Sequence, residues 1–300
     1  MKRDFLTLSD ITPEELAALL ERAAALKAGT DSSACPLMGK SIGLLFDKTS
    51  TRTRISFQTG IYQLGAQAIY INTQELQLGR GETIEDTARV LSRYLHGIVL
   101  RTYAHTTIEK LAANATIPVI NGLTDMHHPC QALADMLTIK EKKGRLRGVR
   151  LVYVGDGNNV ANSLLEAALM TGVELVIACP KGYEPDNRIY TRVVSGGGRV
   201  RIVTDPEEAV RDADVLYTDV WISMGQEREV ERRKKIFRGY QINRRLVSLA
   251  KPDVIVMHCL PAHRGEEITD DVLDSPQSVV IDQAENRLHT QKALLEMLVK

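Results

Sequence analysis

The sequence of 300 residues has no excess of either charge, because 38 lysines and arginines are matched by 38 aspartates and glutamates. Without surplus positive charge, the chain has no broad field to gather nucleic acid or anionic lipid, so any anion site must be local. It also lacks an apolar run near the roughly 20 residues that a membrane helix needs. We therefore expect neither a nucleic-acid nor a membrane partner.

Cysteine is scarce and scattered, at Cys35, Cys130, Cys179 and Cys259, with no C-x-x-C pair. This pattern predicts reduced thiols in a cytoplasmic protein and not a disulfide framework. The first ten residues include two cations but no apolar segment or small-residue cleavage site of a secretory signal. Cytoplasmic localisation is the resulting expectation.

Strand-like and helical patterns alternate along the first half of the chain. An amphipathic helix is expected after Thr12, because Pro13 and Glu15 form an N-terminal capping pattern. The strand-like runs and the helical patterns that follow them alternate at residues 41–46, 55–65, 68–72, 83–95, 97–101 and 107–113. Such alternation is typical of a parallel sheet with helices on both faces.

A second series follows a charged stretch. Strands are expected at residues 149–155, 174–179, 199–204, 215–218 and 254–258, with a helix at 159–171. We predict an α/β chain of two doubly wound parallel-sheet lobes, with the active site in the cleft between them. Residues 1–136 form the first predicted domain and 137–284 the second, and an amphipathic helix at 285–300 is expected to pack back on the first.

Hydroxyls and cations gather at residues 46–54, between a strand and a helix. Ser50, Thr51, Arg52 and Thr53 stand near the expected N-terminus of that helix, where free N–H groups and the positive dipole end favour a phosphate dianion. Ordinary capping beside surface arginines is the plainer interpretation. The clustering of hydroxyls, two arginines and a lysine within seven residues favours anion binding, without a Walker glycine pattern.

A second cluster occupies residues 127–135. Pro129 suits the first turn of a helix, which places His128 and Gln131 on one face, where both can address one carbonyl group. A satisfied turn is the plainer interpretation. His127, His128 and Cys130 could also bind a metal, but no second closely spaced ligand pair completes such a site.

Residues 154–160 read V-G-D-G-N-N-V and open like a dinucleotide fingerprint. The third glycine is absent, and no acidic residue follows the next strand near Cys179, so the nucleotide interpretation is weak. The glycines instead indicate that backbone or Asn159 approaches a small polar ligand. Residues 219–225 and 258–264 also follow predicted strands, where α/β sheets place their ligands, although a cysteine such as Cys259 is most often a buried hydrophobe.

Together, four ordered motifs resemble the aspartate/ornithine carbamoyltransferase family over the whole chain. They are S-T-R-T-R at residues 50–54, H-P-C-Q at 128–131, D-V-W-I-S-M-G at 219–225 and H-C-L-P at 258–261. The last two motifs are similar to the ornithine-using branch and not to the aspartate-using branch. Relatives that use putrescine or acylated ornithines are the near alternatives. Asp47 stands where the family pattern has Glu, which affects a supporting contact.

The resemblance implies transfer of the carbamoyl group of carbamoyl phosphate to the side-chain amine of ornithine, giving citrulline and phosphate in arginine biosynthesis. It implies that residues 1–136 bind carbamoyl phosphate and 137–284 bind ornithine. The residues it matches to carbamoyl phosphate are Ser50, Thr51, Arg52, Thr53, Gln77, Arg101, His128, Pro129, Cys130, Gln131, Cys259, Leu260 and Arg287. Those it matches to ornithine are Asn159, Asp219, Ser223 and Met224.

The same resemblance implies catalytic roles and an assembly. The expected catalytic residues are Arg52, Arg101, His128, Gln131, Asp219 and Cys259. Gln77 is expected to reach the site of a neighbouring subunit, so the expected active unit is a homotrimer or a multiple of one. No cofactor and no metal are expected. An NAD-dependent oxidoreductase and a non-enzymatic binding subunit are the rival classes, and the first depends on the incomplete glycine fingerprint.

Overall fold

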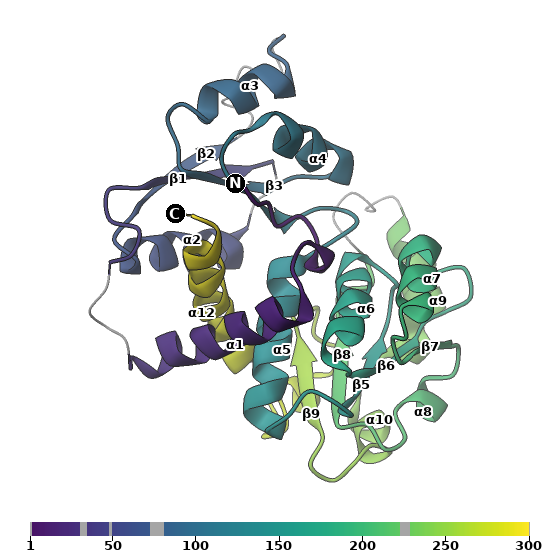
Figure 1. Ribbon diagram of the computed structural model, residues 1–300. Coiled ribbons are helices and arrows are strands. Elements are labelled where there is room, and N and C mark those ends of the chain that lie inside the picture. Colours follow the sequence, from purple (N-terminus) through teal and green to yellow (C-terminus); the bar gives the residue numbers. More distant parts are fainter. Residues whose placement is uncertain (1, 31–34, 48–49, 73–80, 223–228, 300) are drawn as a thin grey trace. The chain divides into compact units, whose positions relative to one another are not determined.

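The computed structural model describes residues 2–30, 35–47, 50–72, 81–222 and 229–299. They divide into two compact units (Figure 1). Unit 1 consists of Met1–Leu137 and Glu285–Lys300, and unit 2 of Thr138–Ala284. The substrate-binding roles expected of the two predicted domains stay predictions for these units.

Unit 1 contains a four-stranded parallel sheet in the order β2-β1-β3-β4. Its strands are β1 (Ser41–Phe46), β2 (Gln67–Asn72), β3 (Gly97–Arg101) and β4 (Val119–Leu123). β1 and β3 are buried along nearly their whole length, as central strands of a covered parallel sheet are. The chain leaves β1 for β2 on one side and β3 lies on the other, so the carboxyl ends of β1 and β3 form the switch point at which such sheets bind ligands.

Unit 1 contains helices as well as this sheet. They are α1 (Pro13–Ala28), α2 (Thr51–Gln63), α3 (Ile84–Leu91), α4 (His105–Asn114), most of α5 (Pro129–Lys143) and most of α12 (Val280–Leu298), with a 3-10 turn η1 at Leu8–Asp10. The Thr12 hydroxyl accepts the N–H of Glu15 at 3.2 Å, which is the expected cap of α1. Figure 1 shows α1 beside α12, and Arg22 pairs with Glu296 between them at 2.6 Å.

Unit 2 contains a five-stranded parallel sheet in the order β7-β6-β5-β8-β9. Its strands are β5 (Arg150–Val154), β6 (Glu174–Ala178), β7 (Val200–Val203), β8 (Val215–Thr218) and β9 (Ile255–His258). The strand order reverses between β5 and β8, so right-handed crossovers place helices on both faces. The second switch point therefore lies at the carboxyl ends of β5 and β8.

The helices of unit 2 are mostly shorter. They are α6 (Asn159–Thr171), α7 (Asn187–Ser195), α8 (Pro206–Ala209), α9 (Val230–Phe237), α10 (Arg244–Ser248) and α11 (Asp270–Leu273), with a 3-10 turn η5 at Arg238–Tyr240. One buried cluster joins Val152, Leu216 and Val256 from three strands to Leu246 of α10 and Val272 of α11. The predicted α/β class with two parallel sheets is confirmed.

Two elements differ from the sequence expectation. β4 was not expected, because Pro118, Asn121 and Gly122 suggest a turn. The strand forms at the edge of the sheet, where the missing N–H of Pro118 breaks no central ladder, and Phe5 donates to the Val119 carbonyl at 2.8 Å. The second difference is α5, which continues as one helix into the charged stretch that precedes the second series and ends at Lys143. None of the described helices is both long enough and apolar enough to cross a membrane.

Candidate active site

The first turn of α2 stands at the carboxyl end of β1. Ser50 is its N-cap, and the Ser50 hydroxyl accepts the N–H of Thr53 at 3.3 Å. Thr51 and Arg52 are the first two residues of the helix, where backbone N–H groups have no partner within the helix. This end of α2 can therefore bind an anion through its N–H groups and its dipole.

Two arginines from distant parts of the sequence meet at Thr53. Arg101 Nη1 donates to the Thr53 hydroxyl at 3.4 Å, and Arg287 Nη2 donates to the same oxygen at 3.0 Å. Arg101 ends β3 and Arg287 lies on α12, and both are buried. Burying guanidinium groups is costly unless an anion and hydrogen bonds compensate. The arrangement therefore suits a phosphorylated ligand.

His128 and Gln131 lie in the same unit, at the start of α5. Burial lowers the pKa of His128 well below its ordinary range, and the charges of Arg287, Arg101 and Arg52 lower it further. These three guanidinium groups thus act on one imidazole, which is neutral at physiological pH. Gln131 Oε1 accepts from Arg287 Nη1 at 2.6 Å, and its Nε2 donates to Asp135 at 2.9 Å.

The neighbours Pro129 and Cys130 have structural contacts. Pro129 is the first residue of α5. The Cys130 thiol donates to the Asn121 carbonyl at 3.4 Å, and burial raises its pKa to about 12. His127 packs against His105 with ring centroids 4.9 Å apart. Among the described residues, His127, His128 and Cys130 do not form a group of converging metal ligands.

Asp219 follows β8 in unit 2 and is almost fully buried. Its Oδ1 accepts from the Cys259 thiol at 2.9 Å, and its Oδ2 accepts from Asn158 Nδ2 at 2.7 Å. Cys259 follows β9, and Asn158 lies in the loop after β5 as the N-cap of α6. Three strand ends thus bring one carboxylate, one thiol and one amide together beside the switch point.

A buried histidine and glutamate hold the loop that contains Cys259. His258 Nδ1 accepts the N–H of Leu260 at 2.8 Å, so its Nε2 is the donor to Glu267 Oε1 at 3.0 Å. Both side chains are fully buried. Leu260 has a left-handed φ of 58°, unusual for a residue other than glycine, and a cis bond to Pro261 follows it. Glu267 was missed at the sequence level, because no spacing rule connects it to His258.

The glycine loop after β5 packs against protein and not around an open space. A Cβ on Gly157 would lie 2.2 Å from the backbone nitrogen of Pro185. Gly157 N donates to the Tyr183 carbonyl at 2.9 Å. The close approach that this glycine permits is therefore made by residues 183–185 and leaves no room for a pyrophosphate, which argues against the dinucleotide interpretation. Asn159, the predicted ornithine ligand, is the first residue of α6.

The predicted site residues thus form two groups in the described part of the chain. Unit 1 brings together Ser50, Thr51, Arg52, Thr53, Arg101, His128, Gln131 and Arg287, and unit 2 contains Asn159, Asp219, Cys259 and Leu260. Gln77, Ser223 and Met224 lie outside the described residues. The cleft expected between the lobes and the residue roles stay predictions.

Two groups of possible metal ligands occur among the described residues. Asp219, His258 and Cys259 bring ligand atoms within 4.8 Å of one another, as do His263, Glu266 and Glu267. Both ring nitrogens of His258 already make hydrogen bonds within the protein. Binding a metal through His258 would therefore break a contact that supports the Cys259 loop.

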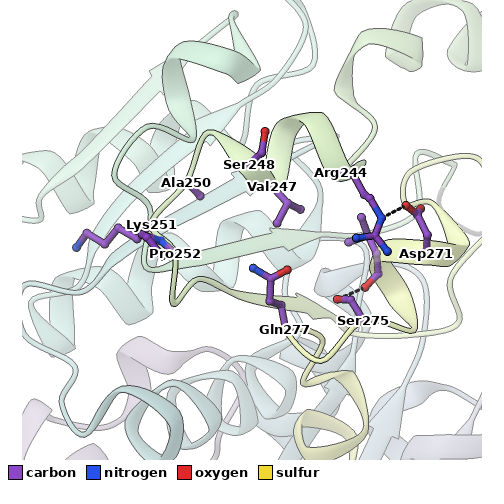
Figure 2. Close-up of a pocket in the computed structure, with 10 residues that line it drawn as sticks. Arg244, Val247, Ser248, Ala250, Lys251, Pro252, Asp271, Ser275 and Gln277 are labelled. Carbon is purple, nitrogen blue, oxygen red and sulfur yellow. Dashed lines mark hydrogen bonds and ion pairs between the residues drawn. The ribbon is translucent and has the colours of Figure 1, made fainter.

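A separate pocket of about 500 Å³ lies in unit 2 near the amino-terminal end of β9 (Figure 2). Lys251 and Pro252, which precede β9, line it together with residues of α10. Arg244 points towards Asp271 at its rim, and the two form an ion pair at 2.6 Å. The pocket contains none of the predicted site residues.

Two family models divide the chain as the sheets do. Residues 3–141 match the carbamoyl-P binding domain of aspartate/ornithine carbamoyltransferase, and residues 147–298 match its Asp/Orn binding domain. The chain belongs to the aspartate/ornithine carbamoyltransferase family.

Relatives within this family match over nearly full length. The ornithine carbamoyltransferase of Syntrophus aciditrophicus (strain SB) is 57% identical over 302 residues, covering 100% of both chains. The protein of Pyrococcus furiosus named ornithine carbamoyltransferase, anabolic, is 56% identical over 303 residues, covering 99% of this chain and 96% of the relative. A solved structure of ornithine carbamoyltransferase from Pyrococcus furiosus matches with a TM-score of 0.95 at 56% identity, covering 99% of this chain and 97% of that one.

Proposed function

We propose that the protein transfers the carbamoyl group of carbamoyl phosphate to the side-chain amine of ornithine, giving citrulline and phosphate. The observation that carries this proposal is the meeting of buried Arg101 and Arg287 at Thr53, next to the N-terminus of α2. This cationic site lies in the part of the chain that matches a carbamoyl-P binding domain. The choice of ornithine as the amine acceptor is supported by the names of the relatives.

On the phosphate side, Ser50, Thr51, Arg52 and Thr53 would hold the phosphate oxygens with Arg101. The neutral His128 would donate an N–H to the carbonyl oxygen, where negative charge develops in the transition state. Gln131 already binds Arg287 and Asp135, and the second N–H of its amide would donate to the carbamoyl group. The arginines would also stabilise the departing phosphate.

On the amine side, ornithine arrives as an ammonium ion, because an alkylamine has a pKa near 10.4 in water. The Asp219 carboxylate accepts the Cys259 thiol proton in a hydrogen bond, so the thiol is the donor and the carboxylate is the available base. Asp219 would take the ammonium proton. The amine nitrogen then bonds to the carbonyl carbon, and the carbon–oxygen bond to phosphate breaks with its electron pair on phosphate, which takes up the second proton of the amine.

We further propose that the active unit is a homotrimer or a multiple of one, with Gln77 reaching a neighbouring subunit. The exposed residues Ile55 and Tyr62 on α2 support this proposal, with 56% and 80% of their surface accessible. They are seven positions apart and therefore share a helix face. Exposed large hydrophobic residues that share a face are typical of protein contacts. The cytoplasmic location stays a prediction.

The reaction belongs to arginine biosynthesis in this proposal, which the word anabolic in the name of one relative supports. The test mixes purified protein with carbamoyl phosphate and, separately, ornithine, N-acetylornithine, putrescine or aspartate, and measures the carbamoylated product and phosphate. We expect ornithine to give a kcat/KM at least 100-fold above the other amines. Faster turnover of putrescine or aspartate would overturn the choice of acceptor, and no turnover at all would overturn the reaction.

A further inference from the structure

The side chain of Asn158 makes contacts in two directions. Its Oδ1 accepts the N–H groups of Val160 at 2.9 Å and Ala161 at 3.3 Å, which caps α6. Its Nδ2 donates to Asp219 Oδ2 at 2.7 Å. One amide therefore joins the start of the helix to the carboxylate at the end of β8.

The chemistry of the neighbours fixes which way this amide faces. The N–H groups of Val160 and Ala161 can only donate, so the carbonyl oxygen of Asn158 must face them. The Tyr153 hydroxyl adds a third donor to the same oxygen at 3.3 Å, and burial raises the pKa of Tyr153, which keeps this proton in place. The NH₂ group is thus aimed at Asp219, and a flipped amide would lose the bonds to Val160, Ala161 and Asp219.

Asp219 is held from both sides by these contacts. Cys259 donates to Oδ1 and Asn158 donates to Oδ2, which leaves each oxygen with further lone pairs for a ligand. Both donors are neutral, so they orient the carboxylate without cancelling its charge. A carboxylate held in this way is suited to an incoming ammonium group.

We propose that Asn158 is a positioning residue for the amine half of the reaction: it orients Asp219 towards the side-chain ammonium of the substrate and ties that orientation to the start of α6. Asn159, the residue matched to ornithine, is the next residue and begins the same helix. Asn158 acts through Asp219 and the α6 N-terminus and needs no contact of its own with substrate. This inference rests on the proposed function.

Asn158→Asp separates positioning from capping. Aspartate caps helices about as well as asparagine, so the bonds to Val160 and Ala161 survive. The second carboxylate oxygen then faces Asp219 Oδ2 where the N–H group had been. Two carboxylates this close cannot both ionise readily, so a proton is retained between them. The shared proton makes Asp219 a weaker acceptor for the ammonium proton.

We expect Asn158→Asp to lower kcat/KM for ornithine about 100-fold at pH 7.5 and to move the acid limb of its pH profile up by at least one unit. The KM for carbamoyl phosphate should stay within about twofold. Asn158→Ser, which keeps a capping oxygen but is too short to reach Asp219, should lose about tenfold with a smaller shift of the limb. If Asn158→Asp does not fold, the Ser variant carries the test.

Asn243→Asp is the matched control. Asn243 caps α10 in the same unit, where its Oδ1 accepts the N–H of Leu246 at 3.1 Å, so the same substitution is made at a helix cap without Asp219 beside it. Its kinetics should equal those of the wild type. Wild-type kinetics and an unshifted acid limb in the folded Asn158 variants would overturn the inference alone. A wild-type protein that forms no citrulline would instead remove the proposed function, and the inference with it.

Discussion

The two units bury opposite charges at equivalent places in their sheets. At the carboxyl ends of β1 and β3, unit 1 buries Arg101 and brings Arg287 to the same hydroxyl of Thr53. At the carboxyl ends of β5 and β8, unit 2 buries Asp219 between an amide and a thiol. These contacts are made by neutral groups, the Thr53 hydroxyl in unit 1 and the Asn158 amide and Cys259 thiol in unit 2. In the proposed reaction, these contacts would orient one unit towards a phosphate and the other towards an ammonium group.

The largest expected effect comes from removing the charge of unit 2. Asp219→Asn keeps the shape of the side chain but cannot accept the amine proton, so kcat should fall about 1,000-fold. The dissociation constant for carbamoyl phosphate should change less than twofold, because most residues assigned to that ligand lie in unit 1 and Asp219 is not among them. Steady-state kinetics and calorimetry measure the two quantities. The exposed helix cap Asp205 offers Asp205→Asn as a control with wild-type kinetics, and an equal loss of carbamoyl phosphate affinity would contradict the division of roles.

A second acid in unit 2 differs from Asp219 because it has a cation beside it. Burial raises the pKa of Asp156 from 3.8 to about 6, the facing Asp219 and Glu229 raise it too, and Arg233, whose Nη1 lies 3.0 Å from Asp156 Oδ2, lowers it. The folded protein therefore holds this proton more tightly than the unfolded chain does. The stability that Asp156 contributes is complete at acid pH and is lost as the pH rises from about 4 to about 6.

Asp156→Asn removes this titration. The free energy of unfolding of the wild type, measured relative to this variant, should fall by roughly 3 kcal/mol between pH 4 and pH 7. Urea denaturation at a series of pH values measures the difference. A difference that grows with pH would mean that the ion pair with Arg233 outweighs the burial of the carboxylate.

On the phosphate side, Arg52→Ala should lower both carbamoyl phosphate affinity and kcat, by about 100-fold in kcat/KM. The reason is that Arg52 would bind the phosphate in the ground state and stabilise its charge as it leaves. Arg89→Ala on α3, where Arg89 makes an exposed pair with Asp86, is the control in the same unit. A loss confined to the ornithine KM would show that Arg52 serves the other substrate.

The smallest expected effect is that of Cys259→Ser, about a tenfold loss of kcat/KM for ornithine. Serine keeps a donor for Asp219 but has a shorter reach than the thiol. The KM for carbamoyl phosphate should change less than that for ornithine. The exposed Cys35 provides Cys35→Ser as the control. Equal losses for both substrates would indicate that Cys259 packs in the loop and does not act on the amine.

Local sequence patterns predicted much of the fold, because apolar runs and helix caps each depend on residues that are close in the sequence. The bounds of β1, α6 and β8 agree with the apolar runs and capping residues that predicted them. β4 was missed because its proline, asparagine and glycine suggest a turn, and only the edge position makes them tolerable. The family motifs identified the candidate site residues but did not predict the contacts between them.

The contacts could not be predicted because they join distant positions. Arg287 is 234 residues from Thr53, and no pattern in either segment refers to the other. Asn158 carries the same amide as Asn159, and only the cap geometry shows that its N–H group faces Asp219. In the sequence, Glu267 looks like an ordinary surface glutamate, and only the structure shows that it is buried against His258. These are properties of tertiary packing.

The packing of Gly157 sets a limit on how this scaffold can be re-engineered. The chain at residues 183–185 fills the space above the glycine, so any residue with a side chain would have to push that backbone away. A mutant library restricted to residues 155–160 should therefore yield no variants that bind NAD or ATP, whichever amino acids are introduced. Coenzyme specificity could be evolved here only by shortening or rerouting the segment after β6 at the same time.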